Sequence, residues 1–354
     1  MVTYNVSLEN KVVLVTGAAG FIGANLVKRL LNEFDSVKVI GIDSITEYYD
    51  VRLKYERLQE LSAYGDRFVF IKDNIAKKEI VESIFTDHHP QVVVNLAAQA
   101  GVRYSITNPD AYIESNLIGF YNILEACRHN GVEHLVYASS SSVYGSNKKV
   151  PYSTDDKVDN PVSLYAATKK SNELMAHAYS KLYNISSTGL RFFTVYGPCG
   201  RPDMAYFSFT DKLLKGETIQ IFNYGNCKRD FTYIDDIVEG MVRIMQYAPK
   251  KKNGDDGLPI PPYKVYNIGN NSPENLLNFV TILQDELIRA GVLPNDYDFE
   301  SHKELVAMQP GDVPVTYADT TPLEQDFGFK PSTSLREGLR KFTGWYAKFY
   351  ETND

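Results

Sequence analysis

The chain has 354 residues, a length that favours two lobes sharing an interface over a single compact core. Its formal net charge of −7 argues against a nucleic-acid-binding surface, which normally carries a basic excess. The cysteines Cys127, Cys199 and Cys227 are widely spaced and support neither a disulfide framework nor a zinc site, so we expect a cytoplasmic protein. No apolar run approaches the roughly 18 residues of a membrane helix. The first residues lack the pattern of a signal peptide, so we expect no membrane association.

Apolar runs typical of buried strands alternate with helical patterns over the first half of the chain. Strands are predicted at 12–16, 37–43, 68–72, 92–97, 135–139 and 187–193. Helices are predicted between them, at 22–34, 52–61, 77–85, 111–129 and 165–182. This alternation predicts βαβ units and an α/β fold of the Rossmann type, which is a doubly wound parallel sheet.

The regular alternation ends near residue 190, where prolines and glycines begin to separate short segments. We therefore expect a nucleotide-binding Rossmann domain at 1–190, to which the chain returns near 233–248. A smaller C-terminal α/β lobe that binds the substrate is expected at 191–354. Within it, the charged and proline-rich stretch 250–262 is predicted to be a solvated loop. Phe342, Trp345, Tyr346 and Phe349 recur at helical spacing and predict a C-terminal helix packed on this lobe.

A glycine-rich turn, TGAAGFIG at 16–23, follows the first predicted strand and opens the first predicted helix. Glycine at positions 17, 20 and 23 allows a tight turn, a close backbone approach to a pyrophosphate and close packing of helix on strand. The helix N-terminus supplies unpaired N–H groups for the phosphates. The alternative is an ordinary glycine turn. In this strand–turn–helix context, the motif favours a dinucleotide site.

Asp43 ends the second predicted strand, 20 residues after Gly23. A carboxylate at this point can accept hydrogen bonds from the adenosine ribose hydroxyl groups, whereas it would repel a 2′-phosphate. Asp43 therefore favours NAD over NADP. The alternative for Asp43 is a solvated aspartate at a strand end.

Tyr165 and Lys169 stand four residues apart in a predicted helix, so both side chains lie on one helical face. An unperturbed tyrosine has a pKa of about 10 and is a poor base at neutral pH. A neighbouring ammonium and a positive nicotinamide ring would both lower that pKa. Ser140, in a serine run that ends a strand, can hold the reacting oxygen. The alternative for Tyr165 and Lys169 is a pair of surface residues on a helix.

The chain resembles the extended short-chain dehydrogenase/reductase family, and within it the UDP-glucuronate 4-epimerases, over nearly its whole length. The motifs that carry the resemblance are TGAAGFIG at 16–23, NLAAQAGVRYS at 95–105, ASSSSVYG at 138–145, SLYAATKKSNE at 163–173, GLRFFTVYGPCGRPDMA at 189–205, KRDFTYIDD at 228–236 and QPGDVPVTYAD at 309–319. The resemblance implies NAD-dependent 4-epimerisation of a UDP-hexuronate, from UDP-glucuronate to UDP-galacturonate, through a transient 4-keto sugar. It also implies bound NAD, a UDP-sugar substrate, and a homodimer formed by the helices at 111–129 and 165–182.

By this resemblance the catalytic residues are Tyr165 as the base, Lys169 as its partner and ribose ligand, and Ser140 as the hydroxyl. The implied cofactor-binding residues, besides Tyr165 and Lys169, are Gly17, Gly20, Phe21, Ile22, Gly23, Asp43, Asn74, Ile75 and Ala97. Asn74 stands where the family usually has an aspartate near adenine. The implied substrate-binding residues are Ser142, Arg229 at the UDP pyrophosphate, Asp312 at the uridine ribose, and Arg103. The alternative for Arg103 is a structural ion pair.

Thr194 and Arg201 are the candidates for substrate choice, because an arginine is a rigid bidentate partner for a carboxylate. We hypothesise that they hold the C6 carboxylate of glucuronate. The alternative for Arg201 is an ion pair with Asp203 in the same loop. No pair of histidines has the spacing of metal ligands, so no metal is expected.

Three other functions remain open at this point. One is a UDP-glucose 4-epimerase, and it is disfavoured because Thr194 and Arg201 are assigned to a C6 carboxylate that UDP-glucose lacks. A UDP-glucuronate decarboxylase is disfavoured because relatives of that kind carry a glutamate where this chain has Ser142. An NAD-sensing regulator on the same fold would lose the tyrosine or the lysine, and here Tyr165 and Lys169 are both present.

Overall fold

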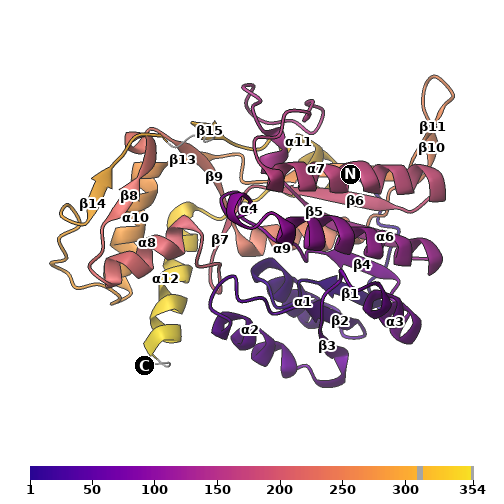
Figure 1. Cartoon of the computed structure of the whole chain (residues 1–354), viewed down its shortest axis with the longest axis horizontal. Helices are drawn as coiled ribbons and strands as arrows, with labels where there is room; N and C mark the ends of the chain where they lie inside the picture. The colour runs from indigo at the N-terminus through magenta and orange to yellow at the C-terminus, as the bar shows by residue number, and fades with distance from the viewer. Residues whose placement is uncertain (309–313, 352–354) are drawn as a thin grey trace.

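The computed structural model describes residues 1–308 and 314–351 and contains, within them, a sheet of seven parallel strands (Figure 1). From edge to edge the strands are β12 (Tyr263–Ile268), β6 (Ser187–Phe192), β5 (His134–Ser140), β4 (Val92–Asn95), β1 (Val12–Thr16), β2 (Lys38–Asp43) and β3 (Phe68–Lys72). The chain starts at β1, builds outward to β3 and then crosses to β4 on the other side. This reversal of strand order is the switch point of a Rossmann fold. The predicted doubly wound sheet is confirmed, and the predicted strands agree with the observed ones to within two residues.

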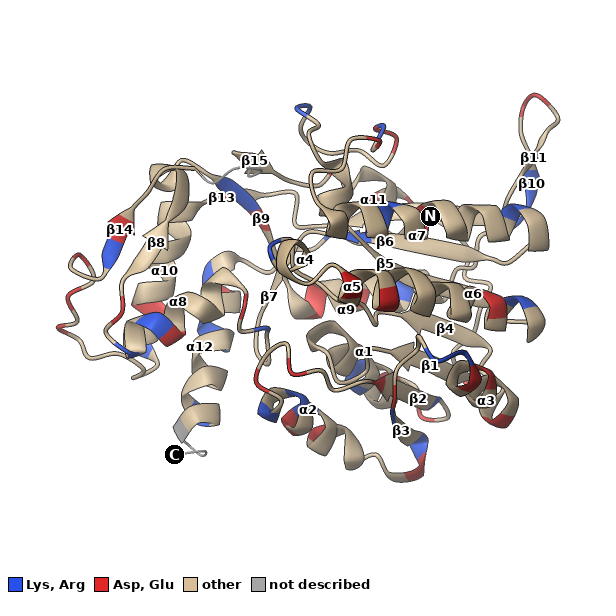
Figure 2. Ribbon diagram, in the orientation of Figure 1, with Lys and Arg blue, Asp and Glu red and all other residues tan. Residues whose placement is uncertain are grey.

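Helices cover both faces of the sheet: α1 (Phe21–Glu33), α2 (Arg52–Ser62), α3 (Lys78–His88), α6 (Gly119–His129), α7 (Leu164–Tyr183) and α9 (Ile234–Met245). The alternation of side chains along β1 explains this arrangement. Val13 and Val15 join the apolar cluster that contains α1 and α9, whereas Leu14 joins the cluster that contains α3 and α6. Figure 2 shows the central strands β1, β4 and β5 almost free of charged residues. Burial on both faces requires such strands.

The helix predicted at 111–129 is present, but its middle is a π-helix. It consists of α5 (Asp110–Tyr112), the π-helical segment η2 (Ile113–Ile118) and α6. The side chain of Asn116 lies in η2 and is buried. Its Nδ2 donates to the carbonyl of Gln99 (3.1 Å) and to Oγ1 of Thr168 (3.0 Å). The π-helical turn thereby ties this helix both to the loop after β4 and to α7. Further short helices are α4 (Tyr104–Thr107), η1 (Gly65–Arg67) and η3 (Ser141–Tyr144).

The later part of the chain forms smaller sheets and helices, most of which lie at the left of Figure 1. A small sheet contains β7 (Thr194–Tyr196), β9 (Lys228–Tyr233), β13 (Pro273–Asn275) and β15 (Val315–Thr316), while β8 (Ile219–Ile221) pairs with β14 (Lys303–Leu305). The helical segments are α8 (Ala205–Leu214), η4 (Phe222–Gly225), α10 (Leu276–Arg289), α11 (Thr321–Phe327) and α12 (Leu335–Glu351). Phe342 of α12 contacts Tyr206 edge-on, with 4.8 Å between ring centroids. The predicted C-terminal helix is therefore confirmed.

Two elements from the second half of the chain belong to the main sheet layer. Helix α9, which falls in the range 233–248, packs on α1. Strand β12, however, lies inside the range 191–354 that was assigned to the smaller lobe, and it pairs with β6 along its whole length. The division at residue 190 itself stays a prediction. The short sequence YKVYNI at 263–268 does not indicate which strand it pairs with, so its position in the sheet is known only from the structure.

The stretch 250–262 is an exposed excursion, as predicted, and contains the small hairpin of β10 (Lys252–Asn253) and β11 (Pro259–Ile260). In residues 1–308 and 314–351, no helix is both long enough and apolar enough to cross a membrane.

Candidate active site

One cavity runs along the carboxyl ends of the parallel strands, on both sides of the switch point between β1 and β4. Open α/β sheets bind their ligands at this edge. The predicted residues that line it are Gly17, Gly20, Phe21, Ile22, Gly23, Asp43, Asn74, Ile75, Ala97, Ser140, Tyr165, Lys169 and Arg201. The fold therefore brings the two main motifs, about 140 residues apart in sequence, into a single site.

The glycine-rich turn is as tight as its sequence predicts. Gly17 has a φ of +71°, and a Cβ there would lie 2.8 Å from the backbone nitrogen of Ala97. A Cβ at Gly23 would lie 2.1 Å from the carbonyl oxygen of Gly17. Gly20 is the N-cap of α1, and no side chain caps the helix there. The N–H groups of the first helical turn therefore remain available at the cavity, as the phosphates of a dinucleotide require.

Asp43 closes the nucleotide end of the cavity. One carboxylate oxygen accepts from the backbone nitrogen of Ala19 (3.1 Å) and the other from that of Ile45 (2.9 Å). Each oxygen keeps a further lone pair that can accept a ribose hydroxyl. Lys54 lines the same region, and its ammonium donates to the carbonyl of Thr46 (2.7 Å). The glycine cradle, the uncapped helix and this carboxylate fit the pyrophosphate and adenosine ribose of NAD.

The tyrosine and the lysine lie on one face of α7, as their spacing predicts. Ser163 caps this helix by accepting from the backbone nitrogen of Ala166 (3.1 Å), and Tyr165 follows in the first turn. Lys169, one turn later, is buried and donates from Nζ to the carbonyl of Ala138 (3.0 Å) on β5. Ser140 ends β5 and accepts from the backbone nitrogen of Ser142 (3.1 Å).

Burial dominates the acid–base properties of these groups. It raises the pKa of the Tyr165 phenol, while a hydrogen bond with Ser140 and the positive charge of Arg201 lower that pKa. Burial also lowers the pKa of Lys169 to about 8. From the sequence we expected the ammonium of Lys169 to lower the pKa of Tyr165. The protein groups that lower this pKa are Ser140, through a hydrogen bond, and Arg201, through its charge.

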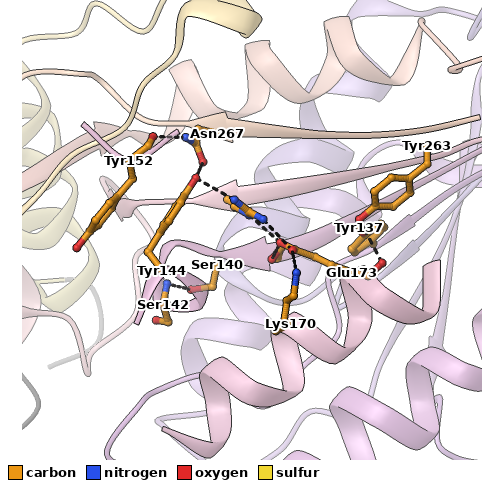
Figure 3. A network of polar contacts seen from close by, with 11 residues as sticks. Tyr137, Ser140, Ser142, Tyr144, Tyr152, Lys170, Glu173, Tyr263 and Asn267 are labelled. Atoms are coloured by element: carbon orange, nitrogen blue, oxygen red, sulfur yellow. Dashed lines mark hydrogen bonds and ion pairs between the residues drawn. The ribbon is translucent and has the colours of Figure 1, made fainter. Parts of the chain in front are cut away.

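A buried ion pair fixes α7 against the sheet behind the catalytic residues (Figure 3). Glu173, one turn beyond Lys169, accepts two hydrogen bonds from Arg191 on β6, at 2.8 and 2.9 Å. The same carboxylate accepts from the hydroxyl of Ser139 (2.7 Å), the neighbour of Ser140. Arg191 also donates to the hydroxyl of Tyr144 (3.0 Å). The network therefore connects the helix of Tyr165 and Lys169 with the strand end that presents Ser140.

The network continues toward the later part of the chain. Tyr144 donates to Asn267 of β12 (2.7 Å), and Asn267 donates to the carbonyl of Tyr152 (2.7 Å). The rings of Tyr144 and Tyr152 stack with 4.4 Å between centroids. The segment around Tyr152 is thus connected to the serine run through buried contacts.

The predicted substrate residues are only partly brought to the cavity. Arg201 lines it and forms the ion pair with Asp203 that was the alternative for this residue, with Nε–Oδ1 at 3.0 Å; its binding of the C6 carboxylate stays a prediction. Thr194 does not line the cavity, although its neighbours Phe193 and Val195 do. Ser142 was expected to point into the cavity and is not among its lining residues; it lies in η3, which directly follows β5.

Arg229 and Arg103 do not line the cavity. Arg229 is on β9 and donates to the carbonyls of Lys228 (3.0 Å) and Pro314 (3.3 Å). The guanidinium of Arg103 lies over the ring of Phe222, 5.4 Å from its centroid. Asp312 lies outside the described residues. Among the described residues, no cluster of histidine, cysteine, aspartate or glutamate side chains could hold a metal ion.

Several lining residues were not predicted. Tyr48, Tyr49 and Lys54 reach the cavity from the segment after β2, and Gln99 and Phe193 from the ends of β4 and β6. The strand ends themselves were a usable signal, since residues after parallel strands gather at one edge. Lys54 had no such signal, because a lysine in a helical pattern is normally solvated.

Fold and site together define the class: a dinucleotide-binding Rossmann protein with a tyrosine and a lysine at the carboxyl edge of its sheet. The model of the NAD dependent epimerase/dehydratase family matches residues 13–269, and the chain belongs to this family. The chain is 50% identical over 345 residues to the protein CapI of Staphylococcus aureus, and this similarity covers 96% of this chain and 99% of CapI. It is 46% identical over 345 residues to UDP-glucuronate 4-epimerase 4 of Arabidopsis thaliana, covering 96% of this chain and 76% of that protein.

A solved structure is also similar over the whole fold. It is the UDP-glucuronic acid 4-epimerase of Bacillus cereus in complex with UDP-glucuronic acid and NAD, with a TM-score of 0.82 and 31% identity. The similarity covers 96% of this chain and 100% of that one.

Proposed function

We propose that this protein is an NAD-dependent isomerase that converts UDP-glucuronate to UDP-galacturonate through a transient 4-keto sugar. The observation that carries the proposal is a single cavity that joins the glycine cradle and Asp43 to Ser140, Tyr165 and Lys169, with Arg201 in its lining. The similarity to epimerases named for UDP-glucuronate supports the choice of sugar.

The cofactor is held by residues whose geometry suits its parts. Gly17, Gly20 and Gly23, with Phe21 and Ile22 of the helix start, receive the pyrophosphate, and Asp43 accepts the adenosine ribose hydroxyls. Further lining residues at the nucleotide are Asn74, Ile75 and Ala97. NAD bound there would supply a reversible hydride acceptor for C4 of the sugar, so it would be regenerated in each cycle.

The chain's own residues handle the proton. Tyr165 takes the proton of the 4-hydroxyl group as the ketone forms and gives it back when the alcohol is restored. Ser140 hydrogen-bonds the same oxygen and, with Arg201, favours the phenolate form of Tyr165. Lys169 is held by the carbonyl of Ala138 and binds the nicotinamide ribose. Inversion requires the sugar to turn between the two transfers, so the affinity must reside in the UDP part.

The residues that we propose for UDP and for the sugar come from the second half of the chain and from two loops. Arg229 binds the pyrophosphate and Asp312 the uridine ribose, while Ser142 and Arg103 contact the substrate near the sugar. Arg201 binds the C6 carboxylate with help from Thr194. The ion pair with Asp203 shows that this guanidinium accepts a carboxylate partner in two-point geometry.

Epimerisation is favoured over reactions that need an extra acid. Among the described residues, the acidic side chains lining the cavity are Asp43, which ends β2, and Asp73, which follows β3, both at the nucleotide end. None follows β5 or β6, where the reacting sugar would lie. A decarboxylase or dehydratase would use a carboxylate there, and Ser142 stands at that point of this sequence.

The test is to incubate the purified protein with UDP-glucuronate, without added NAD, and to analyse the sugar nucleotides by NMR. UDP-galacturonate is the expected product and would establish both the reaction and the retained cofactor. A UDP-pentose with released carbon dioxide would mean that the protein is a decarboxylase. Turnover of UDP-glucose alone would mean that Arg201 does not select a carboxylate. Arg201→Ala is expected to abolish the preference for UDP-glucuronate over UDP-glucose.

We further propose a cytoplasmic homodimer with the two-lobed organisation expected from the sequence, β12 being added to the nucleotide-binding lobe. Exposed apolar side chains support the dimer: Ile113, Ile118 and Tyr121 on the helix 110–129, and Leu174 and Leu182 on α7. These are the two helices expected to pair between protomers. Light scattering should give the mass of a dimer, and Leu174→Arg should shift it toward the monomer; a monomeric wild type would contradict the proposal.

The free thiols of all three cysteines fit a reducing compartment.

A further inference from the structure

Arg57 on α2 is buried, with 3% of its surface exposed, and makes an unusual set of contacts. Its Nη1 donates to the carbonyl of Ala19 (2.9 Å) and to the hydroxyl of Tyr49 (2.9 Å). Its Nε and Nη2 donate to the carbonyl of Cys199, at 3.1 and 2.5 Å, and Nη2 also donates to that of Gly200 (3.0 Å). Among the described residues, none of its hydrogen-bond acceptors is a carboxylate.

Such a contact set is costly to build. A buried guanidinium loses its hydration, and here it regains hydrogen bonds but no neutralising anion. The planar fork of an arginine can nevertheless satisfy several fixed carbonyls at once, because its five donors point in set directions. Arg57 therefore acts as a rigid bridge between the backbone segments that it contacts.

The two bridged segments belong to the two halves of the site. Ala19 lies in the glycine-rich turn, between Gly17 and Gly20, which line the nucleotide end of the cavity. Cys199 and Gly200 immediately precede Arg201. Since the carbonyl of Gly200 belongs to the peptide group that contains the nitrogen of Arg201, holding this carbonyl also holds the backbone from which Arg201 enters the cavity.

The turn before Arg201 has an unusual backbone conformation and is closely packed. Cys199 has a φ of +55°, in the left-handed region that costs energy for a residue with a side chain. A Cβ at Gly200 would lie 1.8 Å from the hydroxyl of Tyr206. The strained conformation at Cys199 directs its carbonyl toward Arg57, and the bridge offsets part of its cost.

We propose that Arg57 is a positioning residue that sets the orientation of Arg201 for the C6 carboxylate and couples this orientation to the cofactor-binding turn. Arg57 is thereby a determinant of sugar specificity that does not touch the substrate. The inference rests on the proposed function, in which Arg201 binds the carboxylate.

The test measures the affinities of the NAD-loaded protein for UDP-glucuronate and UDP-glucose by calorimetry. The quantity compared between variants is the affinity for UDP-glucuronate divided by the affinity for UDP-glucose, called the ratio below. Arg57→Lys keeps the charge but loses the fork, and we expect the ratio to fall by about tenfold, as for the loss of charge-assisted hydrogen bonds. Arg201→Ala should lower the ratio at least as much. In the double variant the two effects should not add, because both act through the same guanidinium.

The control is Arg67→Lys. Arg67 also donates to backbone carbonyls, those of Phe34 (3.2 Å) and Asp35 (3.3 Å), but does not line the cavity. The ratio of the two substrate affinities should therefore be the same in Arg67→Lys as in the wild type. Tyr49→Phe removes one acceptor from Arg57 without removing the charge, and should lower the ratio by a smaller factor. It serves as the decisive variant if Arg57→Lys does not fold.

Each outcome is informative. An unchanged ratio in Arg57→Lys, or in Tyr49→Phe where the lysine variant does not fold, overturns the inference when Arg201→Ala lowers the ratio. Additive losses in the double variant also overturn it. An unchanged ratio in Arg201→Ala instead means that the assignment of Arg201 in the proposed function is wrong.

Discussion

The substitution Glu173→Gln tests whether the buried pair behind the active site stabilises this fold. Glu173 and Arg191 are each 3% exposed, and the carboxylate also accepts from Ser139 (2.7 Å). Glutamine keeps the shape but removes the negative charge and points an N–H₂ group at other donors. Arg191 is then left as a buried cation whose remaining neutral partner is the hydroxyl of Tyr144.

The magnitude follows from this geometry. Removing one partner of a buried pair costs about 3–5 kcal/mol, because the other charge stays buried without compensation. Unfolding entropy of about 2.1 cal/mol/K per residue gives roughly 0.7 kcal/mol/K for a chain of 354 residues. The expected decrease in Tm is therefore about 4–7 °C.

Differential scanning calorimetry of the NAD-loaded protein measures this decrease. The matched control is Glu337→Gln, which breaks an exposed i,i+4 pair with Lys341 (3.1 Å) and should cost less than about 0.5 kcal/mol. Adding Arg191→Met to Glu173→Gln removes the stranded charge and should recover part of the loss. A decrease in Glu173→Gln no larger than that of the control would refute the reasoning.

Two further outcomes follow from buried groups. His134 is fully buried between the carbonyl of Met245 (3.2 Å) and the hydroxyl of Thr188 (2.9 Å), and burial lowers its pKa to about 4. Between pH 6.5 and 4 the unfolded state binds a proton that the folded state does not, so stability falls by about 3 kcal/mol as the pH falls through this window. Urea titrations should show that His134→Gln flattens this fall relative to wild type; parallel pH profiles would contradict it. In Gly23→Ala the new Cβ forces the carbonyl of Gly17 to move by about 1 Å, since contact at 2.1 Å is impossible. The purified variant should retain less NAD, measured by absorbance after denaturation. Gly344→Ala, where no atom lies within 4 Å of the added carbon, should retain as much as wild type.

Short-range patterns were sufficient for most of the framework. The glycine-rich turn, the strand end at Asp43 and the pair Tyr165 and Lys169 each depend on residues that are neighbours in sequence, so their local geometry follows from spacing alone. The alternation of strands and helices then restricts the topology, because parallel strands need right-handed crossovers. For this reason the Rossmann sheet and the nucleotide end of the cavity could be predicted from the amino-acid sequence.

Only the tertiary structure decided which polar residues are buried. Glu173 and Arg57 occupy helical positions where charged residues normally face solvent, and nothing nearby in sequence distinguishes them. Their burial depends on which strand or turn packs on that face, and Arg191 and Cys199 come from distant parts of the chain. The position of β12 beside β6 likewise depends on a partner that the sequence of β12 does not indicate.

The sequence by itself thus determined the kind of chemistry, since a dinucleotide turn and a tyrosine–lysine pair are local features. The tertiary structure decided how the site is held together: an ion pair fixes α7 to the sheet, and Arg57 ties the cofactor turn to the backbone before Arg201. The physical reason is that local patterns set backbone conformation, whereas desolvation and hydrogen bonding of buried charges depend on partners that only the folded chain brings together.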